Sequence, residues 1–498
     1  MSLTDPCPAP FNLAAHVLRA GAATPDKPAL GILSETDAQW WSYARLIATV
    51  QGIATLIAQH SAPGDRILMR LGNGPAFPAA YLGAIAAGRV PVPSSPQLTA
   101  PEATRAASAL DPALVLAGPG IALPDHPAPV LEEAALLEAD ALPPHEYDMG
   151  DPNRLAYIVQ TSGTSGAPRF VCHAHRAIWA RRMMHQGWEG LGPEDRLLHA
   201  GAFNWTFTLG TGLLDPWSVG ATALIPAPGT AAEALPALLA AQGATIFAAA
   251  PGVIRKILRT DLPPMPALRH GLCAGEKLAE PLRTAWRTAT GTGLHEAFGQ
   301  SECSTFISGS PARPAPADTL GFAQPGRRIA IVDDRGPTDG SGQIAIHRDD
   351  PGLMLGYLDA PEATAARFQG EWYLTGDWGH LSPQGAVIYE GRHDDLINAG
   401  GLRVSPVEIE RALTDHPLIG EAAACPLRIG PATEIIGAFY TAETAIPDDD
   451  LRAHLDARLA AYKRPRVMER MDALPRNANN KLDRRSLRAQ WEQDHGHA

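Results

Sequence analysis

Apolar residues in the first part of the chain alternate between a helical and a strand-like period. The stretches FNLAAHVLRAG (11–21) and ARLIATVQGIATLIAQ (44–59) repeat apolar residues every three or four positions, which predicts amphipathic helices. The shorter apolar runs RILMRL (66–71) and RVPVP (89–93) predict strands. Because strands that alternate with helices are typical of parallel sheets, this region predicts an α/β fold with mostly parallel sheets.

The pattern changes near Gly391. Ser405, Pro406 and Glu408 form an S-x-x-E capping box with proline in the first turn, which predicts the start of a helix. Two strand-like runs and a second helical pattern follow, namely GEAAACPL (420–427), EIIGAFYTA (434–442) and DDDLRAHLDARLAAY (448–462). We therefore expect a large N-terminal domain of α/β subdomains over residues 1–392 and a small α+β domain over residues 393–498.

The stretch YIVQTSGTSGAPRF (157–170) joins a strand-like run to a cluster of small residues. A strand that ends in Gly, Ser and Thr lets backbone N–H groups and hydroxyls approach a phosphate closely, so residues 161–166 are a candidate phosphate loop. The alternative is an ordinary solvated turn. The chain contains no G-x-x-x-x-G-K-[ST] motif, and the glycines at 291 and 293 lack the third glycine of a dinucleotide fingerprint.

Composition limits the class of protein. The 498 residues, 45% apolar and 19% charged, are enough for two or more globular domains. No uninterrupted apolar run reaches the ~18 residues that a membrane span needs, and MSLTDPCPAP (1–10) lacks the features of a secretory signal. The five cysteines are scattered without a C-x-x-C pair, which argues against a zinc site and indicates a reducing compartment. We therefore expect a cytoplasmic protein.

The charge distribution argues against nucleic acid as the main partner. The net charge is −12, whereas nucleic-acid binding favours a basic surface. Residues 451–498 nevertheless carry 11 Lys or Arg against 6 Asp or Glu, which suits either a polyanionic small ligand or a solvated helix face. Only five of the 41 basic residues are lysines, so each lysine is more informative than usual.

Five short motifs follow one another along the chain. They are TSGTSGAPR (161–169), AFGQSE (297–302), YLTGD (373–377), GRHDDLINAGGLRVSPVEIE (391–410) and PRNANNKLDRRSL (475–487). In this order and spacing they resemble the adenylate-forming superfamily of acyl-CoA synthetases, peptide-synthetase adenylation domains and luciferases. Residues 73–99 and 187–225 look most like the medium-chain and aryl (benzoate-type) acyl-CoA synthetases, so the resemblance covers nearly the whole chain.

The resemblance implies an AMP-forming carboxylate–CoA ligase. The carboxylate of a medium-chain aliphatic or aromatic acid attacks the α-phosphate of ATP to give acyl-AMP and pyrophosphate, and the thiol of CoA then displaces AMP. Positioned donors and Mg²⁺ stabilise the charge that develops in both steps. The implied partners are the acid, ATP and CoA, and the resemblance is compatible with a homodimer.

The resemblance also assigns residues to the nucleotide. The implied ATP and AMP contacts are Thr161, Ser162, Gly163, Thr164, Ser165, Gly166, Gly275, Glu276, Phe298, Gly299, Gln300, Ser301, Asp377 and Arg392. Within this set the loop holds the β- and γ-phosphates, Phe298 stacks on adenine where the family commonly has Tyr, and Asp377 and Arg392 bind the ribose. Glu302 and Thr164 are the implied magnesium contacts. Without the other motifs, Glu302 would be taken for an exposed glutamate at a turn.

Two catalytic positions are implied by the resemblance. Arg169 stands where the family usually has Lys, and its charge and fork geometry suit phosphate oxygens, although a long Arg can also simply cover surface. Lys481 matches the catalytic lysine that binds the substrate carboxylate and the α-phosphate. Asn480 replaces the usual preceding Gly, and Asn also tolerates the left-handed backbone. Asp394 matches the hinge of a mobile small domain, although Asp is also a common cap.

The acyl pocket is expected along the segment FNWTF (203–207). The implied pocket residues are Phe203, Asn204, Trp205, Phe207 and Phe306. Trp205 is either a pocket wall or a core aromatic. Because these walls are mostly apolar, they favour an uncharged acyl tail over a sugar or an amino acid.

The small domain is expected to present the thiol-binding face after it swings. Gly400 and Gly401 would permit close approach of the pantetheine arm, and Lys463, Arg464 and Arg466 would meet the CoA phosphates. Asn398 stands where the family often has Lys.

Two other functions stay open. A free-standing adenylation enzyme, which would pass the acyl group to a carrier-protein phosphopantetheine, shares all the nucleotide motifs, although no carrier domain follows the last motif. A nucleotide-binding regulatory protein without catalysis is disfavoured by the presence of Glu302, Asp377 and Lys481.

Overall fold

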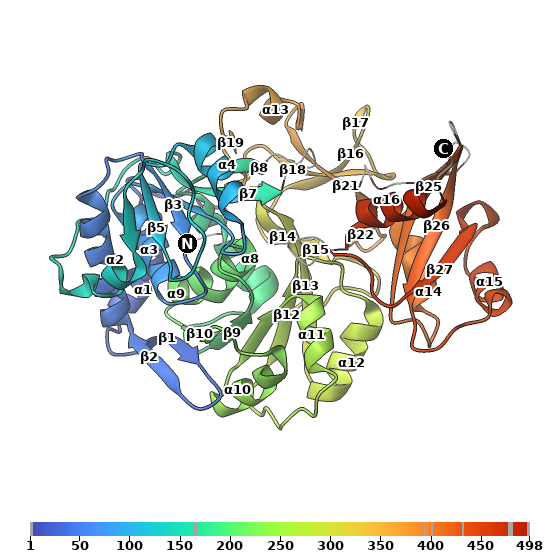
Figure 1. The fold of residues 1–498 in the computed structure, drawn as a ribbon, viewed down its shortest axis with the longest axis horizontal. Coiled ribbons are helices and arrows are strands. Elements are labelled where there is room, and N and C mark those ends of the chain that lie inside the picture. The colour runs from blue at the N-terminus through green and yellow to red at the C-terminus, as the bar shows by residue number, and fades with distance from the viewer. Residues whose placement is uncertain are drawn as a thin grey trace. The chain divides into compact units, whose positions relative to one another are not determined.

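The computed structural model describes residues 3–162, 168–392, 395, 397–399, 402–430, 433–476 and 482–495. The chain forms two compact units, and Figure 1 shows its helices and strands. Unit 1 comprises Met1–Arg328 and His347–Glu371, and unit 2 comprises Ile329–Ile346 and Trp372–Ala498. The predicted domain boundary between residues 392 and 393 falls within unit 2 and stays a prediction.

The largest sheet of unit 1 has nine strands in the order β15-β14-β13-β12-β11-β9-β10-β1-β2. The strands from β13 to β1 run parallel, whereas β2, β14 and β15 are antiparallel to their neighbours. Their bounds are β1 (Pro28–Leu33), β2 (Ala38–Ser42), β9 (Arg196–Ala200), β10 (Thr222–Pro226), β11 (Ile246–Ala249), β12 (His270–Ala274), β13 (Gly293–Gln300), β14 (Ser304–Ser308) and β15 (Phe322–Ala323).

Helices connect the parallel strands, because a parallel neighbour can be reached only by a crossover. In Figure 1, α11 and α12 lie beside β12 and β13. The helices of this region are α6 (Ala177–Ala180), α7 (Arg182–Met184), α8 (Thr206–Leu209), α9 (Asp215–Val219), α10 (Leu235–Ala241), α11 (Pro251–Ile257) and α12 (Glu280–Thr290). The π-helical turns η2 (His185–Glu189) and η3 (Gly210–Leu214) extend α7 and α8.

Unit 1 contains two smaller sheets. A parallel sheet has the order β4-β3-β5-β6, and an antiparallel sheet has the order β19-β8-β7. Their strands are β3 (Arg66–Arg70), β4 (Val90–Pro93), β5 (Leu114–Ala117), β6 (Val130–Glu132), β7 (Leu155–Ser162), β8 (Pro168–Ala174) and β19 (Gly356–Tyr357). The accompanying helices are α1 (Leu13–Ala22), α2 (Tyr43–Ala58), α3 (Ala76–Ala86), α4 (Ala100–Leu110), α5 (Glu133–Leu137) and α13 (Pro361–Ala365).

Helix α3 shows how small residues build the core of unit 1. Its sequence AFPAAYLGAIA has no polar face, and all of its residues are buried. A Cβ on Gly83 would lie 2.7 Å from Cγ2 of Ile53 on α2, and a Cβ on Gly52 would lie 1.7 Å from the carbonyl oxygen of Ala139. Glycine at these positions therefore lets α2 pack closely against its neighbours.

In its described residues, unit 2 contains short sheets and three α-helices. The strands β17-β16-β18-β21 pair in this order, β22 pairs with β21, β23 pairs with β24, and a third sheet has the order β25-β26-β27. The strands are β16 (Ile329–Asp333), β17 (Gly336–Pro337), β18 (Gly342–His347), β21 (Trp372–Leu381), β22 (Val387–Arg392), β23 (Ile397–Ala399), β24 (Leu402–Val404), β25 (Glu421–Gly430), β26 (Thr433–Thr441) and β27 (Val467–Met471). The helices are α14 (Pro406–Thr414), α15 (Asp448–Asp456) and α16 (Arg484–His495).

The predicted fold class is confirmed: the structure is an α/β protein with large parallel sheets and a smaller α+β part. The predicted cap is also confirmed, because the Glu408 N–H donates to Oγ of Ser405 at 3.3 Å. The helix predicted over 448–462 ends earlier, at Asp456, because the guanidinium of Arg464 binds the carbonyl oxygens of Asp456 and Leu459 where the chain turns. Within the described residues, none of the helices has the length and apolarity needed to cross a membrane.

Candidate functional site

The strands β7 and β8 form a hairpin that holds both ends of the predicted phosphate loop. Their register places Thr161 opposite Arg169, and Oγ1 of Thr161 donates to the Arg169 carbonyl oxygen at 3.3 Å. Ser162 ends β7. Of the predicted loop, Gly163, Thr164, Ser165 and Gly166 lie outside the described residues.

Tyr357 joins two of the predicted catalytic residues. Its hydroxyl donates to Oε1 of Glu302 at 2.7 Å, and the guanidinium carbon of Arg169 lies 5.5 Å from the centre of its ring. Glu302 lies on the turn between β13 and β14, whereas Tyr357 ends β19, so the contact brings together distant parts of the sequence. Tyr357 was missed in the sequence because a single tyrosine after glycine gives no chemical signal. We call Arg169, Tyr357 and Glu302 the open cluster, because Arg169 is exposed and Glu302 is half-buried.

The open cluster fits a magnesium ion. Tyr357 engages only Oε1 of the Glu302 carboxylate, and Mg²⁺ needs just one or two carboxylates beside phosphate oxygens and water. Glu302 would hold the ion, and the bound ion would offset the negative charge of the phosphates.

The predicted adenine segments lie close to one another in unit 1. Gly275 has a φ of +96°, and a Cβ there would lie 2.4 Å from the ring of Trp205. Glycine is therefore required for the segment at 275 to pass the indole. Glu276 lies 3.9 Å from Arg255, and the ring of Phe298 meets that of Phe306 edge-on at 5.5 Å.

The hairpin at the end of β13 needs its glycine. Gly299 lies opposite Thr305, and a Cβ on Gly299 would lie 2.2 Å from the carbonyl oxygen of Ser304. Gln300 lies opposite Ser304 in the same register. The glycine thus allows β14 to return close to β13, which fixes the turn that carries Ser301 and Glu302.

The predicted ribose contacts meet within unit 2. The register of β21 and β22 places Asp377 opposite Arg392, and Nη1 of Arg392 lies 3.5 Å from Oδ2 of Asp377. The hydroxyl of Tyr389 donates to Oδ1 of Asp377 at 3.1 Å, and the Asp377 N–H donates to Thr375. Asp377 is only 4% exposed, so the motif residue is fixed by its neighbours. Tyr389 is a further contact that the motif did not reveal.

A small cavity, partly open to solvent, lies within unit 1. Its polar lining residues are Tyr81, Tyr157, His173, Arg181, Asn204, Thr206, Ser301 and Ser304. Two of the predicted site residues, Asn204 and Ser301, are among them. The predicted pocket residues Phe203, Phe207 and Phe306 are buried in the core instead.

The cavity lining draws on several distant elements, which explains why sequence reasoning found only part of it. Arg181 lies between α6 and α7, His173 lies on β8, and Ser304 begins β14. None of these residues belongs to a motif that singles out its chemistry. Trp205 is half-buried and packs edge-on against Phe207 at a centroid distance of 5.3 Å.

The loop that carries the predicted catalytic lysine is fixed at both ends. Lys481 itself lies outside the described residues. Arg476 pairs with Leu482 as an isolated bridge, and the Asp483 N–H donates to the Pro475 carbonyl oxygen at 2.9 Å.

The remaining predicted site residues belong to the C-terminal part of unit 2. Asp394, Gly400 and Gly401 lie outside the described residues. Lys463 donates to both carboxylate oxygens of Glu408, at 2.7 and 2.8 Å, and Arg464 lies 2.9 Å from Asp456. Arg466 is exposed. Two of the three predicted CoA cations are thus engaged in ion pairs within the unit.

Comparison with known families accounts for this arrangement. The AMP-binding enzyme family matches residues 17–358, and the AMP-binding enzyme C-terminal domain matches residues 408–481. The chain belongs to the AMP-binding enzyme family. The resemblance inferred from the five motifs is therefore confirmed.

Among the relatives of this AMP-binding enzyme is "Acyl-coenzyme A synthetase ACSM2, mitochondrial" of Rattus norvegicus, which is 28% identical over 97% of this chain and 92% of its own. A benzoate–CoA ligase of Thauera aromatica is 30% identical over 86% of each chain. The crystal structure of a benzoate CoA ligase from Burkholderia xenovorans LB400 is 26% identical, with a TM-score of 0.83, over 96% of this chain and 100% of that one. The anthranilate CoA ligase AuaEII shares the fold, with a TM-score of 0.86, 23% identity and coverage of 98% and 99%.

Proposed function

We propose that this AMP-binding enzyme is an AMP-forming carboxylate–CoA ligase for medium-chain aliphatic or aromatic acids. The observation that carries the proposal is the adjacency of Ser301, which lines the cavity, and Glu302, which belongs to the open cluster. An acid bound in the cavity would thus lie beside the carboxylate that the family motif assigns to magnesium. Relatives named acyl-coenzyme A synthetase and benzoate–CoA ligase support the same reaction.

The proposed reaction has two balanced steps. In the first, a carboxylate oxygen of the acid bonds to the α-phosphorus of ATP, and the bond to pyrophosphate breaks. In the second, the CoA sulfur bonds to the acyl carbon, the bond to AMP breaks, and the thiol proton is released. Arg169 and the loop from Thr161 would hold the phosphates, and Lys481 would bind the carboxylate and α-phosphate during the first step.

The cavity supports an uncharged acyl tail. Burial lowers the pKa of His173 to about 4, so this cavity residue is neutral at pH 7. The guanidinium of Arg181 is offset by Asp215, to which it donates two hydrogen bonds. A charged acyl tail would therefore be unfavourable in the cavity, because Arg181 and Asp215 already pair with each other and neither is left to balance its charge.

A carrier-protein phosphopantetheine is the alternative acyl acceptor. The ion pairs of Lys463 with Glu408 and of Arg464 with Asp456 favour it, because these cations are already engaged. CoA carries nucleotide phosphates that such cations would bind, whereas a carrier arm carries only one phosphate.

One reaction separates these functions. ATP, Mg²⁺ and a mixed panel of carboxylic acids are incubated with the protein, with and without CoA, and the products are read by mass spectrometry. The ligase forms acyl-CoA and AMP together. Acyl-AMP without a CoA product indicates the carrier-loading enzyme, and bound ATP without AMP indicates a non-catalytic nucleotide-binding protein.

Compartment and assembly are secondary parts of the proposal. The five cysteines are all free thiols, which supports a reducing compartment such as the cytoplasm. A homodimer is compatible with the family, and light scattering of the purified protein would determine the oligomeric state.

A further inference from the structure

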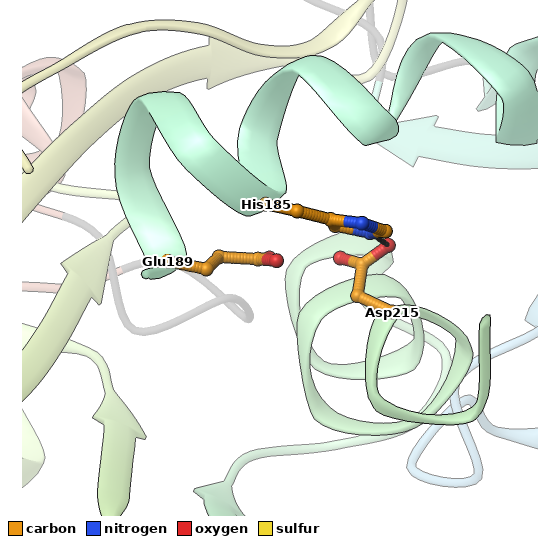
Figure 2. A group of neighbouring side chains, drawn as sticks. All are labelled: His185, Glu189 and Asp215. Carbon is orange, nitrogen blue, oxygen red and sulfur yellow. Dashed lines mark hydrogen bonds and ion pairs between the residues drawn. The ribbon is translucent and has the colours of Figure 1, made fainter. Parts of the chain in front are cut away.

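A largely buried cluster of ionisable side chains lies next to the cavity of unit 1. His185, Glu189 and Asp215 each place one ligand-type atom within 4.8 Å of the other two, and Figure 2 shows the Glu189 side chain directed toward Asp215. Nε of Arg181 donates to Oδ1 of Asp215 at 2.7 Å, and its Nη2 donates to Oδ2. We call these four residues the buried cluster.

The buried cluster is built to hold an arginine rather than a metal ion. The guanidinium of Arg181 already occupies both oxygens of Asp215, and its positive charge would oppose a cation. Burial, together with the charge of Asp215, raises the pKa of Glu189 well above its ordinary value, which favours the protonated acid. A protonated acid is a poor metal ligand.

Arg181 connects the buried cluster to the cavity. Its Nη1 donates to Oγ of Ser304 at 2.6 Å, and both residues line the cavity. Its Nη2 also donates to Thr211 at 3.2 Å. Because Asp215 and Thr211 hold the guanidinium in place, it fixes the position of the Ser304 hydroxyl and adds no uncompensated charge to the cavity.

Ser304 presents a hydroxyl proton that has only a weak partner. Its φ of +61° is in the left-handed region, which serine rarely adopts. Its oxygen accepts from Arg181, and its proton points to Sδ of Met184 at 3.9 Å. A thioether is a weak acceptor, so an oxygen atom in the cavity would be a better one.

His173 also lines the cavity and contains a buried acceptor. Only 2% of the surface of His173 is exposed, and its Nε2 donates to the Ser301 carbonyl oxygen at 2.7 Å. Because Nε2 carries the proton, Nδ1 of the neutral ring is an acceptor. Nδ1 is buried and has no hydrogen-bond partner among the residues that the structure describes.

We propose that this cavity selects a carboxylic acid whose tail carries a neutral oxygen substituent, above all a hydroxyl group. The oxygen of such a substituent can accept the proton of Ser304. The proposal rests on the proposed ligase function and names its substrate class. A second carboxylate or an amine on the tail is disfavoured, because Arg181 and Asp215 already neutralise each other.

The test compares matched acids on three forms of the enzyme. The kcat/KM values for benzoate, its 2-, 3- and 4-hydroxy derivatives, hexanoate and 6-hydroxyhexanoate are measured with wild type, Ser304→Gly and Ser308→Ala. Glycine tolerates the φ of +61° at this position, so Ser304→Gly removes the hydroxyl without backbone strain. Ser308 lies on the same strand and donates to the Gly187 carbonyl oxygen, which makes it the control for a lost buried hydroxyl.

Wild type is expected to prefer its best hydroxylated acid over the unsubstituted one by roughly three- to tenfold, the effect of one hydrogen bond. Ser304→Gly should abolish this preference, and Ser308→Ala should keep it. An unchanged preference in Ser304→Gly, or no preference in wild type, overturns this inference and leaves the ligase function standing. Failure of wild type to turn over any acid overturns the proposed function itself, and the inference with it.

Discussion

The open cluster and the buried cluster contain similar side chains in different surroundings. In the open cluster, Arg169 lies over the ring of Tyr357 at 5.5 Å, and Glu302 accepts one hydrogen bond from the tyrosine hydroxyl. In the buried cluster, Arg181 takes both oxygens of Asp215, which is 0% exposed. One arrangement leaves a carboxylate oxygen available to a ligand, whereas the other uses both.

Burial decides what an acid can do in each cluster. A charge without water must be paired, so Asp215 is committed to Arg181, and the raised pKa of the neighbouring Glu189 favours its neutral form. A half-buried acid such as Glu302 can exchange water for a cation. The difference predicts that substitutions in the open cluster change catalysis, whereas those in the buried cluster change stability.

Asp215→Asn should give the largest loss of stability. It removes the counter-charge of a buried guanidinium, so the free energy of unfolding should fall by about 3–5 kcal/mol. Chemical denaturation of the variant measures the loss. Asp195→Asn is the matched control, because its partner Arg269 is 47% exposed and can be rehydrated. Equal losses in the two variants would contradict the role given to burial.

Arg169→Ala should reduce kcat/KM for ATP by roughly ten- to a hundredfold, the loss of a charge-assisted hydrogen bond to phosphate. Arg169→Lys should recover most of the activity, because the charge is kept. Steady-state rates of AMP formation measure both. Full activity in Arg169→Ala would mean that this arginine only covers surface.

Tyr357→Phe should have a smaller effect on the same cluster. It removes the hydrogen bond to Glu302 and keeps the ring beneath Arg169, so the rate should fall by roughly two- to tenfold. The loss should appear mainly as a higher Mg²⁺ concentration at half-maximal rate. A variant with the same Mg²⁺ dependence as wild type would separate Tyr357 from the metal.

Glu189 should produce the smallest effect, a dependence of stability on pH. The pKa of this acid is raised in the folded protein above the ordinary value of 4.5, so the folded state binds more protons than the unfolded state above that pH. Its contribution to stability is therefore present below about pH 4.5 and is lost as pH rises toward the folded pKa.

The check on Glu189 uses a substitution that does not titrate. Glutamine at position 189 does not titrate, so Glu189→Gln lacks this loss. The melting temperature of the variant, relative to that of wild type, should therefore rise as the pH increases from 5 to 8. Parallel pH profiles for the two proteins would show that Glu189 does not titrate differently on folding.

The open cluster could be predicted from the sequence only in part. Glu302 and Arg169 belong to contiguous motifs, because a loop that binds phosphate needs a fixed local sequence. Tyr357 could not be predicted, since its role depends on β19 pairing with β8. Arg181 and Ser304 were missed for the same reason: their hydrogen bond joins residues 123 positions apart.

The fold was more predictable than the cavity. Periodicity gave α1, α2 and the capped start of α14, because local apolar pattern and capping determine these elements. The aromatic residues expected to line the acyl pocket are mostly in the core, since sequence alone does not show which face of a short helix such as α8 meets the cavity.

The most direct measurement applies one substitution to both clusters. Glu302→Gln and Glu189→Gln are compared for the rate of acyl-AMP formation and for melting temperature. Glu302→Gln should lose roughly a hundred- to a thousandfold in rate, the usual effect of removing one stabilising group, with an unchanged melting temperature. Glu189→Gln should keep the rate within about threefold, since no bond to substrate is lost. A severe loss of adenylation in Glu189→Gln, together with an active Glu302→Gln, would contradict this account.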